Sequence, residues 1–199
     1  NFPLGGNALN SLQDFMRIGE FEVPTVHDYM DRLRSGMLSS RLISYDSTKK
    51  TYTAKNYSAK ARYETQKHLN EHPLFSRKAV SRPQAMQIFY PRAYETFTSF
   101  GDTTNARIIQ ERISVLKMAE AQKLNITVAG RIDYTVGMIV DVHMFKMQPI
   151  RKTESNDEIT DEILSGRYLV TAINHTISSE GHECYMELSK DSTMKNLDK

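Results

Sequence analysis

Regular alternation of apolar and polar residues over the last third of the chain constrains the fold more than any other feature. Residues 126–132 carry apolar side chains at positions 126, 128 and 132, with threonine and arginine among the residues between them. Successive side chains of a β-strand point to opposite faces, so this period predicts a strand with one buried face. The same period recurs over 138–144, 167–177 and 182–189, which predicts a sheet of antiparallel hairpins.

The last two of these strands are predicted to form one hairpin around the turn Ser178-Ser179-Glu180-Gly181. Its second arm has an apolar face and a mostly acidic face, formed respectively by Cys184, Met186 and Leu188 and by Glu183, Tyr185 and Glu187. The apolar face is expected to point into the core, because a strand at the surface of a domain buries only one of its faces.

A short helix and a second hairpin are predicted upstream. Thr25 can cap a helix over about 26–35, and Gly36 is a typical residue just after a helix end. Residues 37–45 and 50–57 have high strand propensity and flank a polar turn. These two segments are therefore expected to pair as a hairpin.

The strongest helix is predicted at about 103–123. Asp102 or Thr103 can cap its first turn, and Ile109, Ile113 and Leu116 mark one apolar face. A helix with a single apolar face needs a partner surface, so it is expected to lie on a sheet.

Together these elements predict an α+β, mainly β fold: a small antiparallel β-barrel with one long packed helix and a mixed α/loop insertion. Closing the sheet into a barrel would remove its exposed edges. The predicted parts are a lead-in segment with a short helix at 1–36, a barrel domain formed by 37–57 and 102–190, an inserted excursion at 58–101 and a flexible tail at 191–199. Within the barrel domain, 150–166 is predicted to be an acidic loop.

Composition excludes several functional classes. Hydrophobic residues make up 39% and charged residues 25% of the chain, and no apolar run approaches the length of a membrane span. The net charge of +2 does not indicate a nucleic-acid coat. Cys184 is the only cysteine, so no internal disulfide can form, and a reducing compartment such as a bacterial cytoplasm is expected.

Residues 68–72 form the sharpest catalytic pattern, His-Leu-Asn-Glu-His. On a helix, His68 and His72 would lie one turn apart and could share a zinc ion, with Glu71 beside a bound water. Pro73 would end such a helix at once, and no third ligand is marked. A solvated end of a helix at 60–71 is therefore the preferred interpretation.

A glycosidase pair is a second catalytic candidate. Glu180, Glu183 and Glu187 could supply two carboxylates, but they fall on the polar face of a hairpin, where acids are expected without any activity. The chain contains no G-x-S-x-G, P-loop or G-x-G-x-x-G motif. We therefore expect no catalytic residue, no cofactor site and no metal ligand.

The segment 58–101 combines basic and aromatic residues, a mixture typical of single-strand nucleic-acid platforms. Its basic members are Lys60, Arg62, Lys67, Arg77, Lys78, Arg82 and Arg92, and its aromatic members are Tyr63, Phe75, Phe89, Tyr90, Tyr94, Phe97 and Phe100. The preferred interpretation is a small satellite core with a solvated charged surface. Nucleic-acid binding stays open as an alternative.

The order of several short sequence pieces resembles the C-terminal barrel of T4-type contractile-phage baseplate hub proteins. The pieces are Arg-Ile-Ser-Val-Leu-Lys-Met-Ala at 112–119, Leu-Asn-Ile-Thr-Val-Ala-Gly at 124–130, Val-Gly-Met-Ile-Val-Asp-Val at 136–142, Gly-Arg-Tyr-Leu-Val-Thr-Ala-Ile-Asn-His-Thr-Ile at 166–177, His-Glu-Cys-Tyr-Met-Glu-Leu at 182–188, and an opening hairpin at 35–46 and 50–53. The resemblance covers roughly 25–190. Similar barrels occur in type VI secretion spike proteins and other contractile injection systems.

The resemblance implies a structural protein of the phage virion, assembled in the cytoplasm of the bacterial host. In that family, three subunits with two similar barrels each form a ring that joins the tail tube protein to the cell-puncturing spike or tail lysozyme. This chain would hold the second barrel, act as a homotrimer and catalyse no reaction. The alternatives are a single-stranded nucleic-acid-binding module that uses 58–101 and a peptidoglycan-cleaving tail enzyme.

Overall fold

A computed structural model of the chain describes residues 16–24, 36, 38–47, 49–74, 82–92, 103–146 and 160–196. The chain divides into two compact units. The first, called the half-barrel here, comprises Asn1–Val26 and Gln122–Lys190. The second unit comprises His27–Ala121 and Asp191–Lys199. Among the helices of the described residues, none is long and apolar enough to cross a membrane.

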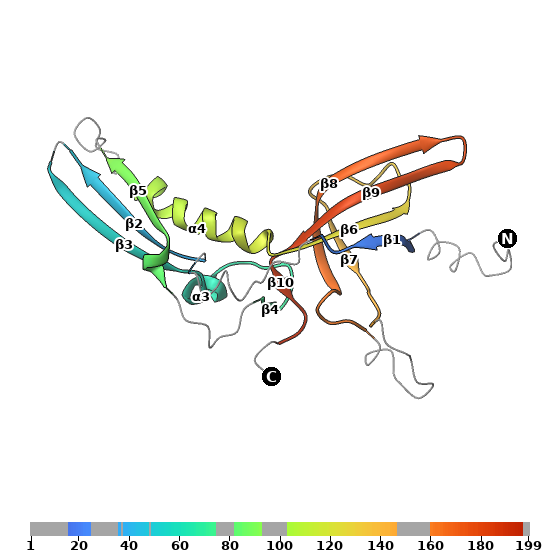
Figure 1. The fold of residues 1–199 in the computed structure, drawn as a ribbon, viewed down its shortest axis with the longest axis horizontal. Helices are drawn as coiled ribbons and strands as arrows, with labels where there is room; N and C mark the ends of the chain where they lie inside the picture. Colours follow the sequence, from blue (N-terminus) through green and yellow to red (C-terminus); the bar gives the residue numbers. More distant parts are fainter. Residues whose placement is uncertain are drawn as a thin grey trace. The chain divides into compact units, whose positions relative to one another are not determined.

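The half-barrel is one curled five-stranded sheet in the order β1-β6-β9-β8-β7, and every neighbouring pair is antiparallel (Figure 1). Its strands are β1 (Ile18–Glu22), β6 (Gln122–Ala129), β7 (Ile139–Val142), β8 (Gly166–Ser178) and β9 (Gly181–Lys190). The four strands predicted from alternation correspond to β6 to β9. Strand β1 lies in the predicted lead-in segment and was not expected to be a strand.

One face of this sheet holds the core of the half-barrel. Leu124, Leu188 and Cys184 are fully buried there, and Met186 is 1% exposed. The apolar face predicted for the last strand is thus confirmed, because Cys184, Met186 and Leu188 all point into the core while Glu183 and Tyr185 are exposed. Burial of this apolar stripe is the main contribution to the stability of the half-barrel.

A β-bulge interrupts the pairing of β8 with β9 between Val170 and Ala172. Val170 lies opposite Leu188, but beyond the bulge His175 lies opposite Cys184. The inserted residue shifts the alternation by one position. Before the bulge the even-numbered residues of β8 face the core, and beyond it the odd-numbered residues lie on that face. The bulge therefore decides which side chains of outer β8 meet those of β9.

Beyond the bulge the β8–β9 hairpin continues as an exposed ribbon, which we call the outer arm and define as residues 174–183 (Figure 1). All of its residues except the half-buried His182 are exposed, and Ile177 near its tip is 78% exposed. The arm therefore gains little stability from the core and depends on contacts between its own two strands.

The second unit packs helix α4 (Thr103–Ala119) on a three-stranded sheet in the order β3-β2-β5 (Figure 1). Its strands are β2 (Ser39–Asp46), β3 (Thr51–Ser58) and β5 (Gln87–Arg92). The buried Gln110 of α4 donates from Nε2 to the Ser40 carbonyl oxygen at 3.0 Å and joins helix to sheet. Met118 of α4 belongs to a small apolar cluster with Leu38, Tyr57, Ala59 and Tyr63.

Several predictions for this unit are confirmed. The chain is mainly β, the hairpin expected at 37–57 is β2 with β3, and the long helix expected at 103–123 is α4, which ends at Ala119. The apolar face predicted for this helix is wrong, because Gln110, Ser114 and Met118 are buried while Leu116 is 54% exposed. The short helix expected at 26–35 and most of the acidic loop expected at 150–166 lie outside the described residues.

The compact units divide the chain at different places from the predicted domains. Strand β5 pairs in parallel with β2, so the predicted excursion at 58–101 shares a sheet with the 39–58 hairpin. Both belong to the second unit, whereas the hairpin was expected in the barrel domain with the C-terminal strands. The tail predicted from residue 191 begins with a buried two-residue strand, β10 (Ser192–Thr193), paired with β4 (His72–Pro73).

Candidate functional site

The prediction of a helix at 60–71 is wrong, so the structure lacks the helical spacing that His68 and His72 would need to share a zinc ion. Only α3 (Ala59–Arg62) and a single 3₁₀ turn at Tyr63–Thr65 form there, and Gln66 already has an extended backbone. His68 therefore does not lie one helical turn from His72, which belongs to strand β4. Residues 68–70 are instead held by hydrogen bonds to Asp191 and Ser192.

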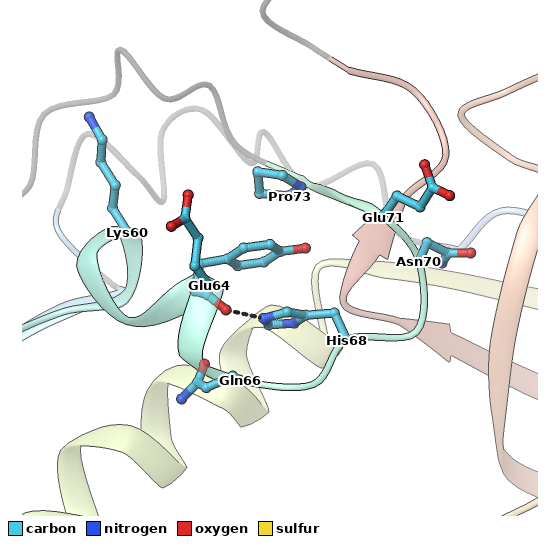
Figure 2. Close-up of a pocket in the computed structure, with 8 residues that line it drawn as sticks. Lys60, Glu64, Gln66, His68, Asn70, Glu71 and Pro73 are labelled. Carbon is cyan, nitrogen blue, oxygen red and sulfur yellow. Dashed lines mark hydrogen bonds between the residues drawn. The ribbon is translucent and has the colours of Figure 1, made fainter.

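His68 is a buried structural residue (Figure 2). Its ring stacks on that of Tyr63 with centroids 3.7 Å apart, and its side chain is 8% exposed. Nδ1 lies 2.8 Å from Oδ2 of Asp191, and Nε2 lies 2.9 Å from the Tyr63 carbonyl oxygen. Both ring nitrogens thus face oxygen acceptors, so neither points toward a metal ion. This arrangement also differs from the solvated helix end that the sequence favoured.

Asp191 organises the turn around this histidine. Its Oδ1 accepts hydrogen bonds from the Leu69 amide at 3.2 Å and from the Ser192 hydroxyl at 2.7 Å. The Asn70 amide donates to the Ser192 hydroxyl at 2.7 Å and extends the same network. A carboxylate with three partners at a half-buried position stabilises the loop that follows α3.

A pocket of about 470 Å³ opens beside this network (Figure 2). Its lining consists of Lys60, Tyr63, Glu64, Gln66, His68, Asn70, Glu71 and Pro73. Burial raises the pKa of Tyr63 well above its usual value, so this phenol keeps its proton and is not a general base. Glu71 is 88% exposed and lies 4.0 Å from His72. Nothing in this geometry brings an acid and a base together on one reacting atom.

Replacing Asp191 with alanine is expected to lower the free energy of unfolding of the second unit by about 2 kcal/mol, because His68 and the Leu69 amide lose a buried charged acceptor. Hydrogen–deuterium exchange over 63–74 should rise in the variant. Glu71→Ala in the same pocket is the matched control and should change the free energy by less than about 0.5 kcal/mol. Equal effects of the two substitutions would contradict the structural role assigned to Asp191.

The three glutamates that could supply the two carboxylates of a glycosidase, Glu180, Glu183 and Glu187, lie on the β8–β9 hairpin. Glu187 accepts from Lys123 Nζ at 2.9 Å and from the Thr171 hydroxyl at 3.1 Å. The hydrogen bond from Lys123 holds the pKa of this carboxyl below its usual value. Glu183 is an exposed strand residue and Glu180 lies in the turn. Glu187 thus has a structural partner, and its low pKa is unsuited to a general acid.

The aromatic residues of the 58–101 segment that the structure describes differ in burial. Tyr63 is buried in the core of the second unit, whereas Phe89 on β5 is 73% exposed. Arg77 and Lys78, the basic pair at the middle of the segment, lie outside the described residues. Tyr63 packs with Leu38, Tyr57 and Met118, so its core includes residues from outside the segment and is not the separate satellite core that the sequence favoured.

The two edges of the half-barrel are the feature with the clearest capacity for binding. Strands β1 and β7 end the sheet, and in the described part of the chain neither has a partner strand on its outer side. Each edge exposes apolar side chains: Phe21 on β1, and Ile139 on β7 with Phe145 just beyond it. An exposed edge carries unpaired amide and carbonyl groups that can pair with a strand of another chain.

A second feature has no counterpart among the sequence predictions. His175, His182 and Cys184 bring two imidazole nitrogens and a sulfur within 4.8 Å of one another on the β8–β9 hairpin. We call these residues the His–His–Cys cluster. The sequence places Cys184 on the apolar face but does not reveal the bulge that turns His175 to the same face.

No protein-family model matches the chain, and no curated protein sequence matches it. Its function must therefore be argued from the sequence order and the geometry described above.

Proposed function

We propose that the chain is a structural part of a contractile-phage baseplate hub, in which it helps to form the trimeric ring between the tail tube and the cell-puncturing spike. The order of sequence pieces from 25 to 190 supports this proposal, and the curled antiparallel sheet is compatible with a barrel wall. The observation that carries the proposal is the pair of open edges on that sheet.

A closed ring requires a head-to-tail interface, in which one surface of a subunit meets a different surface of the next. Strands β1 and β7 lie at opposite ends of the strand order and differ in sequence, so they meet this requirement. Their exposed apolar residues would be covered by a neighbouring subunit. In this proposal the half-barrel becomes a complete barrel wall in the assembled ring.

The test uses the protein co-expressed with a candidate spike protein and analysed by native mass spectrometry. We expect a trimer that carries three spike chains. Ile139→Asp on edge strand β7 should reduce the trimer at least tenfold, because it places a charge in a strand-pairing interface. Ile132→Asp is the matched control, since Ile132 is 92% exposed in a turn and should leave the trimer intact.

A wild-type protein that stays monomeric with its spike protein present would overturn the proposal. A salt-sensitive shift of short single-stranded DNA that is lost in the Arg77→Glu, Lys78→Glu variant would favour the nucleic-acid alternative. Lysis of purified cell wall that is lost on Glu71→Gln or Glu183→Gln would favour the enzyme.

A further inference from the structure

We propose that the His–His–Cys cluster on the β8–β9 hairpin is a zinc-binding site. Cys184 Sγ lies 3.0 Å from His175 Nδ1 and 3.8 Å from His182 Nε2, and the two nitrogens lie 3.0 Å apart. Three potential ligand atoms from three residues thus form a small triangle. This inference is independent of the proposed role in a hub, and it departs from the expectation that the chain has no metal ligand.

The triangle has the size that a zinc ion requires. Zinc lies about 2.3 Å from a thiolate sulfur and about 2.0 Å from an imidazole nitrogen, so tetrahedral ligands are about 3.3–3.6 Å apart. The three separations here bracket those values. Two imidazoles and one thiolate are also among the ligands that zinc prefers, and three protein ligands leave one position for water or a fourth donor.

Hydrogen bonding alone does not account for all three contacts. Each ring nitrogen has either one proton or one lone pair, and the thiol has a single proton to donate. Any choice of tautomers satisfies at most two of the three contacts and leaves the third without a proton between its atoms. A metal ion uses one lone pair from each atom, and the thiol proton is released to solvent when it binds.

The fold positions each ligand by a separate device. The bulge between Val170 and Ala172 turns His175 onto the face of Cys184, its direct cross-strand partner. His182 precedes Cys184 by two residues on β9 and therefore points to the same face. Cys184 is fully buried in the core, which fixes its sulfur.

Gly130 supports the ring of His182 from the neighbouring segment. Its amide donates to the His182 carbonyl oxygen at 2.7 Å. A Cβ built on Gly130 would lie 2.1 Å from Cγ of the His182 ring, so any larger residue would displace the imidazole. The close approach of backbone and ring requires glycine at this position.

The ion would join the two strands of the outer arm, which has little other support. All three ligands belong to β8 and β9, and they lie where the arm leaves the core of the half-barrel. The carbonyl oxygen of Arg131 lies 4.0 Å from Sγ of Cys184. The guanidinium of Arg131 forms an ion pair with Asp133. The inferred role is therefore a structural clamp at the base of the arm.

The test uses the untagged chain, stripped with chelator, kept under reducing conditions and titrated with Co²⁺ and then Zn²⁺. We expect one Co²⁺ per chain with a thiolate-to-cobalt charge-transfer band and tetrahedral visible bands, which Zn²⁺ abolishes by displacing cobalt. His175→Ala should weaken Zn²⁺ binding at least tenfold while leaving the melting temperature in chelator unchanged, because His175 is exposed. His143→Ala, an exposed histidine beside Asp141, is the matched control and should bind as the wild type does.

Gly130→Ala should weaken Zn²⁺ binding at least tenfold without removing a ligand. Cys184→Ser removes the thiolate band, but it alters the core, so the exposed His175 variant decides the test. A wild-type chain without a charge-transfer band would overturn the proposal. Unchanged cobalt spectra and zinc affinity in His175→Ala would overturn it as well.

Discussion

Leu188→Ala is expected to lower the free energy of unfolding of the half-barrel by about 3 kcal/mol. Leu188 is fully buried on β9, the middle strand of the sheet, and pairs with Leu124 on one side and Val170 on the other. Truncation removes apolar contacts with both neighbours, and close packing on each side prevents the cavity from collapsing fully.

Urea unfolding followed by far-UV circular dichroism measures this loss, and hydrogen–deuterium exchange over 122–129 assigns it to the half-barrel. Ile177→Ala on the outer arm is the matched control, since it removes an aliphatic side chain that is 78% exposed. Its effect should stay below about 0.5 kcal/mol. If the two substitutions were equally mild, the apolar stripe of β9 would not be the core of this unit.

Raising the pH from about 8 to about 10.5 is expected to stabilise the wild-type half-barrel relative to Lys190→Met. Lys190 is fully buried on β9, where Nζ donates to the Ser165 carbonyl oxygen at 3.0 Å and lies 4.6 Å from the ring centroid of Tyr168. Burial lowers the pKa of its ammonium from 10.5 to about 8, and attraction to Asp161 offsets part of that shift.

The direction of the effect follows from proton binding. Between pH 8 and 10.5 the unfolded chain keeps the lysine proton while the native state has released it, so the free energy of unfolding rises with pH. The gain over this window is about 3 kcal/mol, because each unit of pKa difference corresponds to about 1.4 kcal/mol. Below pH 8 the native state holds a buried ammonium and the cost of burying it is fully present.

Urea unfolding of both proteins at several pH values checks this prediction. The methionine variant keeps the apolar stem and lacks the titrating group, so other groups that titrate in the same window cancel in the comparison. A difference between the two proteins that stays constant from pH 8 to 10.5 would show that the amine of Lys190 is solvated in the folded state.

Local patterns predicted much of the secondary structure. Alternation located β6 to β9 because each of these strands buries one face. The apolar period located α4 but not its buried face, because the polar residues Gln110 and Ser114 are buried and Leu116 is exposed. Strand β1 has a mostly exposed pattern, so alternation carries no signal there and only its pairing with β6 defines it. The parallel pairing of β5 with β2 was missed because it joins segments more than forty residues apart, about which local pattern carries no information.

The candidate sites were harder to predict because they depend on register and on distant contacts. The pattern at 68–72 predicted two histidine ligands for one metal ion only if the segment was helical. In the structure the segment is not helical, and it makes contacts with Asp191, which is far away in the sequence. The pair His182 and Cys184 was visible as two residues on one strand face. His175 could join them only through a one-residue bulge, which local propensity does not predict.

The bulge on β8 also makes the outer arm a separately adjustable part of the protein. If the register of Val170 with Leu188 continued without the bulge, Asn174 would lie opposite Cys184 and His175 would point to the other face. One extra residue in β8 thus decides which side chains meet on the outer arm, while Tyr168 and Val170, which precede it, keep their places in the core.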